Sequence, residues 1–433
     1  MGESGERGVR LATAAGRRLG LRVEEPRVLH DVFNTLVHLA PAPVVVRVPS
    51  LTFASAAEQE ARQRRELAVV SWLADRGAPV VPPSPLVPRE PVPCEDTSLT
   101  FWQYVEEVDP IAAAPPGTLE ERFAEQTAWT VRLHREMAGY PGELTVLAPL
   151  VPGAKTALAE LRARPHVLAS GGLTLADLDR AEREYAEVEA LAADFTGHFP
   201  GARVQAVHGD CPSFNVLRTA HGHLFCDFED VTLAPVEWDL AGLGPSALDR
   251  YEQAGGRRVD RALLTLMEGV RMLQVVAALA FASKMPDLAA MLADTLRQWR
   301  VRPRSPWTRP VSVRPGGGDG RGHRAPRPSG QEAVRRRSGE RGVQVAAAQV
   351  VLDQKLDEVG DEGFDDHDGR LGQQRAEESR HWENLTGDDV RLSQCSLVRG
   401  YGAGASPVTF GERSMNDVTP GQGSVKGRPR GGR

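Results

Sequence analysis

Lysine is almost missing from this chain of 433 residues. Only Lys155, Lys284, Lys355 and Lys426 occur, so the first 154 residues carry no ammonium side chain. Cysteine is scarce as well, with four residues and no CxxC spacing. This argues against a cysteine-based zinc site and a disulfide framework, and it fits a reducing cytoplasm.

An excess of positive charge and long apolar runs are also missing. The net charge is −6, which argues against a nucleic-acid-binding role, because such proteins present a basic face. Residues 1–7 lack the apolar core of a secretory signal. The most apolar run, 272–283, is shorter than the roughly 20 residues that cross a bilayer. We therefore expect a buried helix there, no membrane partner and a cytoplasmic protein.

The C-terminal part of the chain differs from the rest in composition. From residue 303 to 433 the sequence is rich in glycine and arginine and has little apolar periodicity. Such composition favours disorder, so we predict a low-complexity, disordered tail. A frameshifted continuation of the gene is a further hypothesis for its origin.

Apolar patterning before the tail predicts two lobes. β-Branched and alternating segments at 27–30, 35–39 and 43–48 predict a small antiparallel sheet. Helical spacing follows over 55–74, and Gly77 ends it. Helical spacing dominates after residue 105. We predict an α+β fold, with residues 1–105 as an N-terminal lobe and 106–302 as a mostly helical C-terminal lobe.

The most informative stretch is His208-Gly-Asp-Cys-Pro-Ser-Phe-Asn215, followed by Asp227-Phe-Glu-Asp230. Apolar runs at 204–207 and 224–226 predict two buried strands that could form a hairpin, with polar residues at their exits. Phosphoryl transfer needs one carboxylate to orient a hydroxyl, and an amide and a carboxylate to hold Mg²⁺ on the phosphates. Asp210, Asn215 and Asp227 provide these groups.

These motifs, together with Trp238-Asp-Leu-Ala241, resemble the aminoglycoside phosphotransferase family of small-molecule kinases, which have a protein-kinase-like fold. The resemblance covers residues 10–302 approximately. Softer matches lie at 99–105, similar to the strand that links the lobes, and at Leu133-His134. The resemblance implies ATP or GTP as phosphate donor, Mg²⁺ as cofactor and a hydroxyl group of a small molecule as acceptor.

The resemblance also implies roles for single residues. Asp210 would be the catalytic base, and Asn215 and Asp227 the magnesium ligands. His208 and Asp239 would support the loop, with Asp239 accepting hydrogen bonds from its backbone; an ordinary helix N-cap is the simpler alternative for Asp239. Asn215 could also be a plain turn residue. Glu229 is either a water-mediated ligand of a second metal or a solvent-facing carboxylate.

Arg47 is the main departure from the family pattern. Related kinases hold the donor phosphates with a lysine on the third strand, and this lobe has none. Arg47 is the only cation in that strand, and a guanidinium can bind phosphate in a bidentate manner. We expect Glu66 to orient it, with Glu58 and Glu60 as competing partners. The alternative is an outward-facing arginine.

The remaining donor site is weaker in the sequence. The loop over residues 30–35 contains no glycine, so Asn34 and Thr35 would contact the phosphates through their side chains, unless the loop is a simple hairpin turn. The donor base would lie against Phe101, Gln103 and Val105, mainly through backbone groups.

Three questions stay open at this stage. The acceptor is not specified; an acidic lining for a cationic aminoglycoside could come from Glu106, Glu107, Asp109, Asp249 and Glu252, or these could be ordinary surface charges. The glycine-free loop and Arg47 also allow a nucleotide-binding pseudokinase that acts as an interaction protein. The oligomeric state is likewise undetermined.

Overall fold

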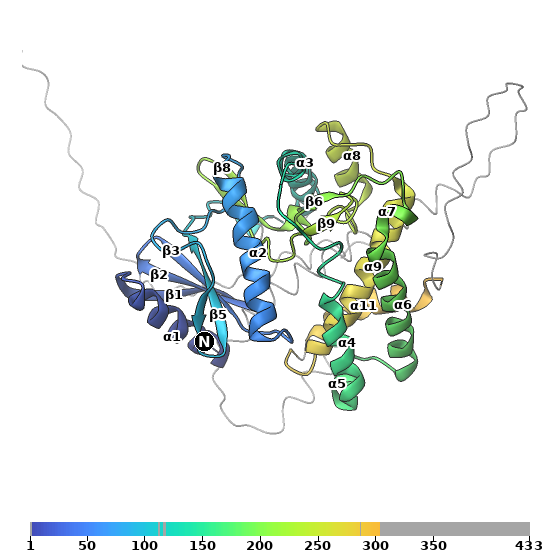
Figure 1. Cartoon of the computed structure of the whole chain (residues 1–433), viewed down its shortest axis with the longest axis horizontal. Coiled ribbons are helices and arrows are strands. Elements are labelled where there is room, and N and C mark those ends of the chain that lie inside the picture. Colours follow the sequence, from blue (N-terminus) through green and yellow to red (C-terminus); the bar gives the residue numbers. More distant parts are fainter. Residues whose placement is uncertain (1, 111–112, 116–117, 286, 304–433) are drawn as a thin grey trace, which may run out of the picture. The chain divides into compact units, whose positions relative to one another are not determined.

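The computed structural model describes residues 2–110, 113–115, 118–285 and 287–303 (Figure 1). The predicted tail lies outside them, apart from residue 303. The elements follow in this order: α1 (Glu3–Arg18), β1 (Val23–Asp31), β2 (Asn34–Pro41), β3 (Val44–Pro49), α2 (Ala56–Ala74), β4 (Val92–Cys94), β5 (Thr97–Gln103), α3 (Leu119–Met137), α4 (Gly153–Ala163), α5 (Pro165–Ser170), α6 (Leu175–Ala193), α7 (Phe195–His198), β6 (Gln205–Val207), η2 (Pro212–Phe214), β7 (Val216–Thr219), β8 (Gly222–Phe225), β9 (Thr232–Ala234), α8 (Pro245–Gln253), α9 (Arg261–Ala278), η3 (Leu279–Phe281), α10 (Leu288–Met291) and α11 (Ala293–Val301).

The N-terminal lobe is built on a five-stranded antiparallel sheet with the order β1-β2-β3-β5-β4. The predicted strands and the predicted helix after them are confirmed. In the centre of the sheet, Arg47 pairs with Leu36 on β2 and with Thr100 on β5. Directly paired residues share a face of a sheet, so this register decides which side chains accompany Arg47.

The two faces of this sheet are covered by different helices. Small and apolar residues of α1, such as Leu11 and Ala15, pack on the face that carries Val37 and Val46. Helix α2 lies on the opposite face, where Gln63 Nε2 donates to the Ser98 carbonyl at 2.8 Å. Helix α1 was not predicted, because its glycines weaken the helical signal.

Helix α2 begins with a capping box, in which Ser55 and Glu58 bond each other's backbone amides. Its C-terminal half carries Val69 and Leu73, which are fully buried with Leu133 of α3 and Phe225 of β8. This apolar cluster joins α2 to the second lobe, so the helix is fixed from both sides.

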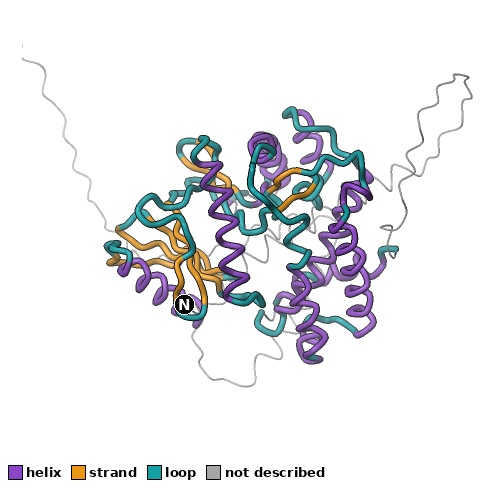
Figure 2. The backbone as a smooth tube through the Cα atoms, in the orientation of Figure 1, coloured by secondary structure: helices purple, strands orange, loops and turns teal. Residues whose placement is uncertain are grey.

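The second lobe is mainly helical, in contrast to the strand-rich first lobe (Figure 2). Its core includes Trp238 and Trp299, both with no exposed surface. The segment Arg261–Phe281 is long and apolar enough to cross a membrane by length and composition, but 67% of its most apolar window is buried inside the protein. The core helix of a globular lobe has the same properties, as expected from the sequence.

The prediction of a hairpin between 204–207 and 224–226 is wrong. Strand β6 pairs with β9 instead, and β8 pairs with β7. The sequence Val216–Thr219 is itself a strand, and Thr219 pairs with Gly222 across a two-residue turn. A tight local hairpin closes a much shorter loop than the predicted pairing, at a lower entropic cost.

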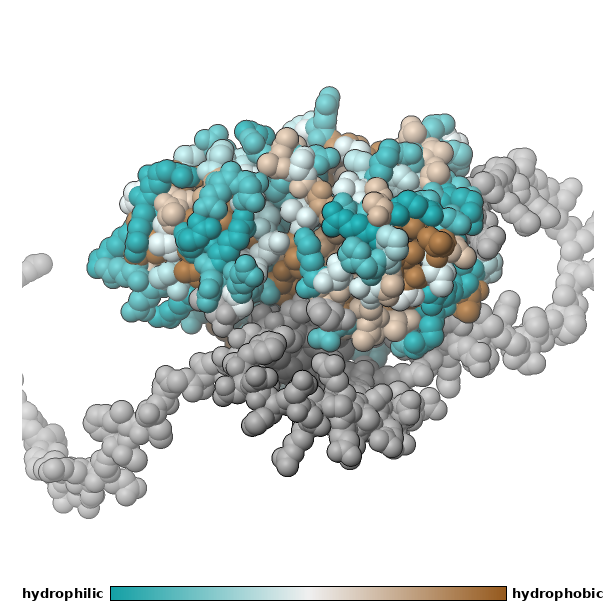
Figure 3. Space-filling view, turned by 90° about the horizontal axis from the view of Figure 1, so that it is seen from below, coloured by the Kyte–Doolittle hydropathy of each residue, from teal (hydrophilic) through white to brown (hydrophobic). Residues whose placement is uncertain are grey.

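The face of the molecule in Figure 3 is largely hydrophilic, and hydrophobic residues form only small patches on it. Few large apolar side chains are strongly exposed among the described residues; they are Leu29, Leu86, Val108, Leu175 and Val301.

The core of the second lobe extends to its last helix, which can be tested at Trp299. Trp299→Ala should lower the free energy of unfolding by about 3–5 kcal/mol, because it removes a fully buried indole. Urea unfolding measures this loss. Leu175→Ala, at a side chain that is 61% exposed, is the control and should change stability by no more than about 0.5 kcal/mol. Equal effects of the two changes would contradict the described packing of α11.

Candidate active site

The loop that follows β6 is held by one buried carboxylate. Asp239 accepts the backbone N–H of His208 at 2.9 Å and that of Gly209 at 2.8 Å. His134 Nε2 donates to the same carboxylate at 3.1 Å. Burial alone would raise the pKa of Asp239, but these hydrogen bonds hold it below its ordinary value, so the group stays ionised.

His208 connects this loop to the segment that carries Asp227. Its Nε2 donates to the Cys226 carbonyl at 2.8 Å, and its Nδ1 accepts the N–H of Asp210 at 3.4 Å. The backbone of Cys226 is used a second time, because its N–H donates to the Asn215 carbonyl at 3.0 Å. Cys226 therefore brings both ends of the loop 208–215 next to Asp227.

Three residues of this region have left-handed backbone conformations. Gly209 has φ +95°, Cys211 has φ +35° and Asp227 has φ +59°. A Cβ atom on Gly209 would lie 1.8 Å from the carbonyl oxygen of Asp230, so only glycine fits there. Non-glycine residues pay for such conformations, and strain of this kind is concentrated at functional sites.

Asp210 and Asn215 are in contact. Asn215 Nδ2 donates to the Asp210 carbonyl at 2.7 Å and lies 3.4 Å from its Oδ2. Asn215 is thus anchored through its nitrogen, which leaves its amide oxygen as the atom able to face a cation. Burial raises the pKa of Asp210, and the nearby guanidinium of Arg271, at 3.7 Å from Oδ1, opposes this rise.

Arg47 links the two lobes. It forms a buried ion pair with Glu66 of α2, and its Nη1 lies 2.9 Å from Asp227 and 3.9 Å from Glu229. Burial alone would lower the pKa of Arg47, but these carboxylates raise it. The side chain of Asp227 is 41% exposed.

The competing partners of Arg47 are engaged elsewhere. Glu58 belongs to the capping box of α2, and Glu60 pairs with Arg64. The structure therefore brings Glu66, rather than either of these, to Arg47. Asn34 also reaches the site, because its side chain lies near Glu229 and helps to lower the pKa of that carboxyl group, together with Arg62 and Arg47 and against the effect of burial.

The structure does not bring the side chains of Thr35 and Phe101 to the site. Thr35 is buried and bonds Asp31 at 2.7 Å and Ser50 at 2.6 Å, and Phe101 is buried in the cluster with α1. Successive side chains of a strand point to opposite faces, so Asn34 and Trp102 lie on the face of Arg47 instead. The Arg47 guanidinium lies 5.6 Å from the centroid of the Trp102 ring.

Backbone amides at the end of β5 and in the linker that follows it form hydrogen bonds within the protein. The amide of Gln103 donates to the Pro82 carbonyl at 3.0 Å, and that of Tyr104 donates to the Pro43 carbonyl at 2.9 Å. These bonds fix the linker between the lobes next to Val105.

Two arginines of the site were missed in the sequence. Arg62 of α2 donates to the Glu229 carbonyl at 3.2 Å and forms an ion pair with Asp230, and Arg271 of α9 contacts Asp210. Arg62 lies one turn before Glu66, which could have suggested a shared helix face. Arg271 could have been noticed because it is an isolated arginine in the apolar sequence of α9.

Residues suggested for an acidic acceptor lining are partly neutralised. Asp109 pairs with Arg122 at 3.1 Å, and Glu252 accepts the backbone N–H of Val259 at 3.0 Å. Asp249 is an exposed residue of α8. This arrangement gives no support for a dedicated acidic subsite.

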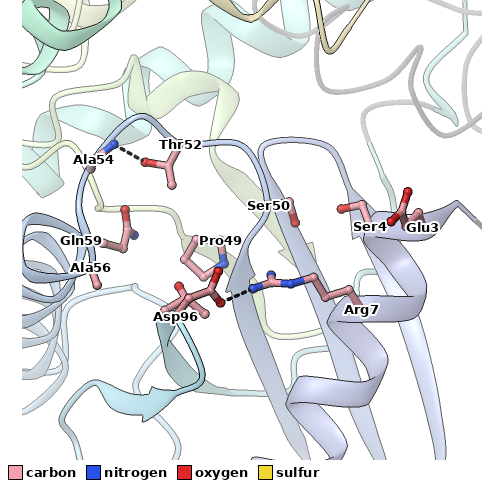
Figure 4. A pocket seen from close by; sticks show the side chains of 11 residues that line it. Glu3, Ser4, Arg7, Pro49, Ser50, Thr52, Ala54, Ala56, Gln59 and Asp96 are labelled. Carbon is pink, nitrogen blue, oxygen red and sulfur yellow. Dashed lines mark hydrogen bonds and ion pairs between the residues drawn. The ribbon is translucent and has the colours of Figure 1, made fainter.

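A polar pocket of about 430 Å³ lies elsewhere in the first lobe (Figure 4). It is lined by the start of α1, the loop after β3, the start of α2 and the turn before β5. None of the predicted site residues lines it. Arg7 and Asp96 form an ion pair of 2.6 Å at this pocket.

The donor set fits magnesium. Among the described residues no group of three histidine, cysteine, aspartate or glutamate side chains is arranged to hold a metal ion. Magnesium does not require such a cage, since it is held by one or two protein oxygens together with phosphates and water. The Asn215 amide oxygen and the Asp227 carboxylate are oxygen donors of this kind. The region also has excess negative charge, because four carboxylates pair with only two arginines, Arg47 and Arg62.

The fold is protein-kinase-like. It consists of a sheet lobe and a helical lobe, with an arginine–glutamate pair on the third strand and the following helix. A family model described as "Phosphotransferase enzyme family" matches residues 3–279. The chain belongs to this family of phosphotransferases.

Three solved structures that resemble the chain are distant from it in sequence. Choline kinase LicA from Streptococcus pneumoniae is 13% identical, with a TM-score of 0.46 over 68% of this chain and 99% of that chain. APH(2")-IIa in a ternary complex with streptomycin and ATP is 12% identical, with a TM-score of 0.42 over 66% and 95%. A microcompartment-associated aminopropanol kinase is 16% identical, with a TM-score of 0.42 over 67% and 99%. A comparison with curated proteins gives no significant match.

The close approach at Gly209 generates a test of the loop geometry. Gly209→Ala should lower the free energy of unfolding by about 2–5 kcal/mol, because a left-handed alanine is strained and its Cβ would collide with the Asp230 carbonyl. Urea unfolding gives the stability.

Gly222→Ala is the matched control. Gly222 also has a left-handed backbone, with φ +128°, but no atom lies within 4 Å of its added Cβ. We expect only the strain of about 1–2 kcal/mol. If both variants lose the same stability, the described contact between Gly209 and Asp230 is not present.

Proposed function

We propose that the protein transfers the terminal phosphate of ATP or GTP to a hydroxyl group of a small molecule. Residues 1–105 would form the nucleotide-binding lobe and 106–302 the catalytic and acceptor-binding lobe, in a cytoplasmic enzyme. The observation that supports the proposal is that both His208 and Asn215 hydrogen-bond the backbone of Cys226, which keeps the segments with Asp210, Asn215 and Asp227 next to one another.

Asp210 would act on the acceptor. Its carboxylate would accept the hydrogen bond of the attacking hydroxyl and orient it in line with the terminal phosphate. The new bond joins the acceptor oxygen to phosphorus, the bond from phosphorus to the bridging oxygen of the donor breaks, and the hydroxyl proton passes to Asp210. His208 and Asp239 would keep the loop in place.

Asn215 and Asp227 would hold magnesium against the donor phosphates. Bound Mg²⁺ would neutralise the charge that develops on the phosphate oxygens. Arg47 would contact the phosphates from the opposite lobe, oriented by Glu66, and Asn34 would approach from the tip of the β1–β2 hairpin. The donor base would lie near the linker at Gln103 and Val105.

One observation favours a second candidate. Arg47, the proposed phosphate ligand, and Asp227, the proposed metal ligand, form an ion pair with each other at 2.9 Å. A pseudokinase that binds nucleotide and acts through interactions could keep this pair closed. The two candidates differ in turnover, because a pseudokinase binds nucleotide without consuming it in the presence of any acceptor.

Turnover of nucleotide with a panel of aminoglycosides, macrolides, amino alcohols and sugars tests the proposal. With an active acceptor, Asp210→Ala should lower turnover by about 10²-fold or more, as is typical for removal of a general base, while nucleotide affinity is largely retained. Asp287→Ala, at an exposed carboxylate without a side-chain capping bond, should behave like the parent protein. Equal turnover of the Asp210 variant and the parent would remove the catalytic assignment.

Magnesium dependence tests the metal ligands. Asp227→Ala should reduce nucleotide affinity in the presence of Mg²⁺ by at least about 10-fold, which is the scale found even for residues that only orient metal ligands. Titration calorimetry with Mg²⁺ and with EDTA gives the two affinities, and the variant should show little difference between them. An affinity that neither EDTA nor the substitution alters would contradict the metal role.

A further inference from the structure

A buried arginine of α9 lies directly behind the catalytic loop. Arg271 Nη1 donates to the Gly209 carbonyl at 3.1 Å, and its Nη2 donates to the Trp238 carbonyl at 3.1 Å. The guanidinium stacks on the Trp238 ring, 4.0 Å from its centroid. The side chain is only 9% exposed, so these contacts form inside the protein.

The contacts of Arg271 converge on the residue before Asp210. The Gly209 carbonyl accepts from Trp238 Nε1 at 2.8 Å as well as from Arg271, while its N–H is bound by Asp239. Both peptide groups of Gly209 are therefore fixed. Since Gly209 has the left-handed conformation that turns the chain toward Asp210, its orientation sets that of the Asp210 side chain.

Among the described residues, the charge of Arg271 is matched by one long ion pair, with Asp210. Arg271 Nη1 lies 3.7 Å from Asp210 Oδ1, longer than a hydrogen bond, and it donates to the neutral Gln274 side chain at 2.9 Å. A buried guanidinium is costly unless its surroundings compensate for lost hydration. Here the compensation comes from loop carbonyls and the side of the Asp210 carboxylate that faces away from Asn215.

We propose that Arg271 is a positioning residue for phosphoryl transfer, which holds the Gly209 peptide and the Oδ1 side of Asp210 so that the carboxylate meets the acceptor hydroxyl. This inference rests on the proposed function of Asp210. Arg271 itself touches neither donor nor acceptor. Its planar fork matters more than its charge, because two carbonyls in different peptide groups are bound at once.

The same lobe contains a close structural counterpart. Arg180 is also buried, stacks on Trp299 at 4.3 Å and donates to the carbonyls of Arg300 and Arg302, at 2.9 and 3.2 Å. It pairs with Glu184, and within the described part of the chain its polar contacts lie outside the loop 208–215. Arg180→Met is therefore a control that removes a similar set of contacts with other residues than those of the loop 208–215.

The experiment compares Arg271→Met, Arg180→Met and Asp210→Ala in the full chain. The assay is phosphoryl transfer to the best acceptor of the panel, or to water if no acceptor is used. We expect Arg271→Met to lower kcat by about 10- to 10²-fold with little change in KM for nucleotide, the effect of a small misplacement of a reacting group. Arg180→Met should leave kcat near that of the parent, even where both lower the urea midpoint.

A double-mutant cycle separates positioning from a general loss of structure. If Arg271 acts through Asp210, the variant with both Asp210→Ala and Arg271→Met should turn over no more slowly than Asp210→Ala alone. Additive losses, or equal losses of kcat in the Arg271 and Arg180 variants, would overturn the inference. Where the methionine variant does not fold, Arg271→Lys, which keeps the charge but not the fork, enters the same cycle with the same expected outcome.

The two levels of the hypothesis fail in different ways. If Asp210→Ala leaves transfer unchanged, the proposed role of Asp210 is wrong and the inference falls with it. If Asp210→Ala removes transfer while Arg271→Met remains as active as Arg180→Met, only the positioning role is wrong.

Discussion

The structure depends on a buried, ionised aspartate that organises backbone rather than substrate. Asp239 has no exposed surface, and its carboxylate is bound by two loop amides and by His134. A buried charge is tolerated only when its hydrogen-bonding capacity is filled, and here the amides that fill it belong to the residues before Asp210. The hydrogen bonds that offset the burial of Asp239 are thus the same bonds that fix the shape of the loop.

This arrangement extends outward in layers. His134 is in turn held by the hydroxyl of Tyr251, and the Gly209 carbonyl is held by Trp238 and Arg271. None of these residues contacts a phosphate in the proposed mechanism. Their contribution is to make one conformation of a strained turn much more stable than others, which is what catalysis by orientation requires.

Much of the fold and part of the site could be predicted from the sequence. The β-branched segment around Arg47 and the helix that carries Glu66 have strong local patterns, and their order placed the two charges near each other. Asp210, Asn215 and Asp227 were found through motif spacing, which is local as well. The strand at Val216–Thr219 was missed because four residues give little periodicity, and the strand pairing was wrong for that reason.

Other features depend on contacts that a sequence pattern does not contain. Thr35 and Phe101 were placed at the site, but the register of the sheet puts their side chains on the face covered by α1. A shift of one residue reverses the faces of a strand, so prediction of a strand does not decide its orientation. Arg62 meets Glu229, and Arg271 meets Asp210, across more than 60 residues of sequence, which no local pattern records.

The arginine on β3, where related kinases have a lysine, can form ion pairs with both lobes. A planar guanidinium can bind Glu66 and Asp227 at the same time, whereas an ammonium would act as a point charge. Metal binding to Asp227 would compete with its ion pair to Arg47 and release one edge of the guanidinium toward the donor phosphates. Under the proposed mechanism, Mg²⁺ on Asp227 and phosphate on Arg47 would each break the same ion pair between these two residues. Binding of one would therefore favour binding of the other.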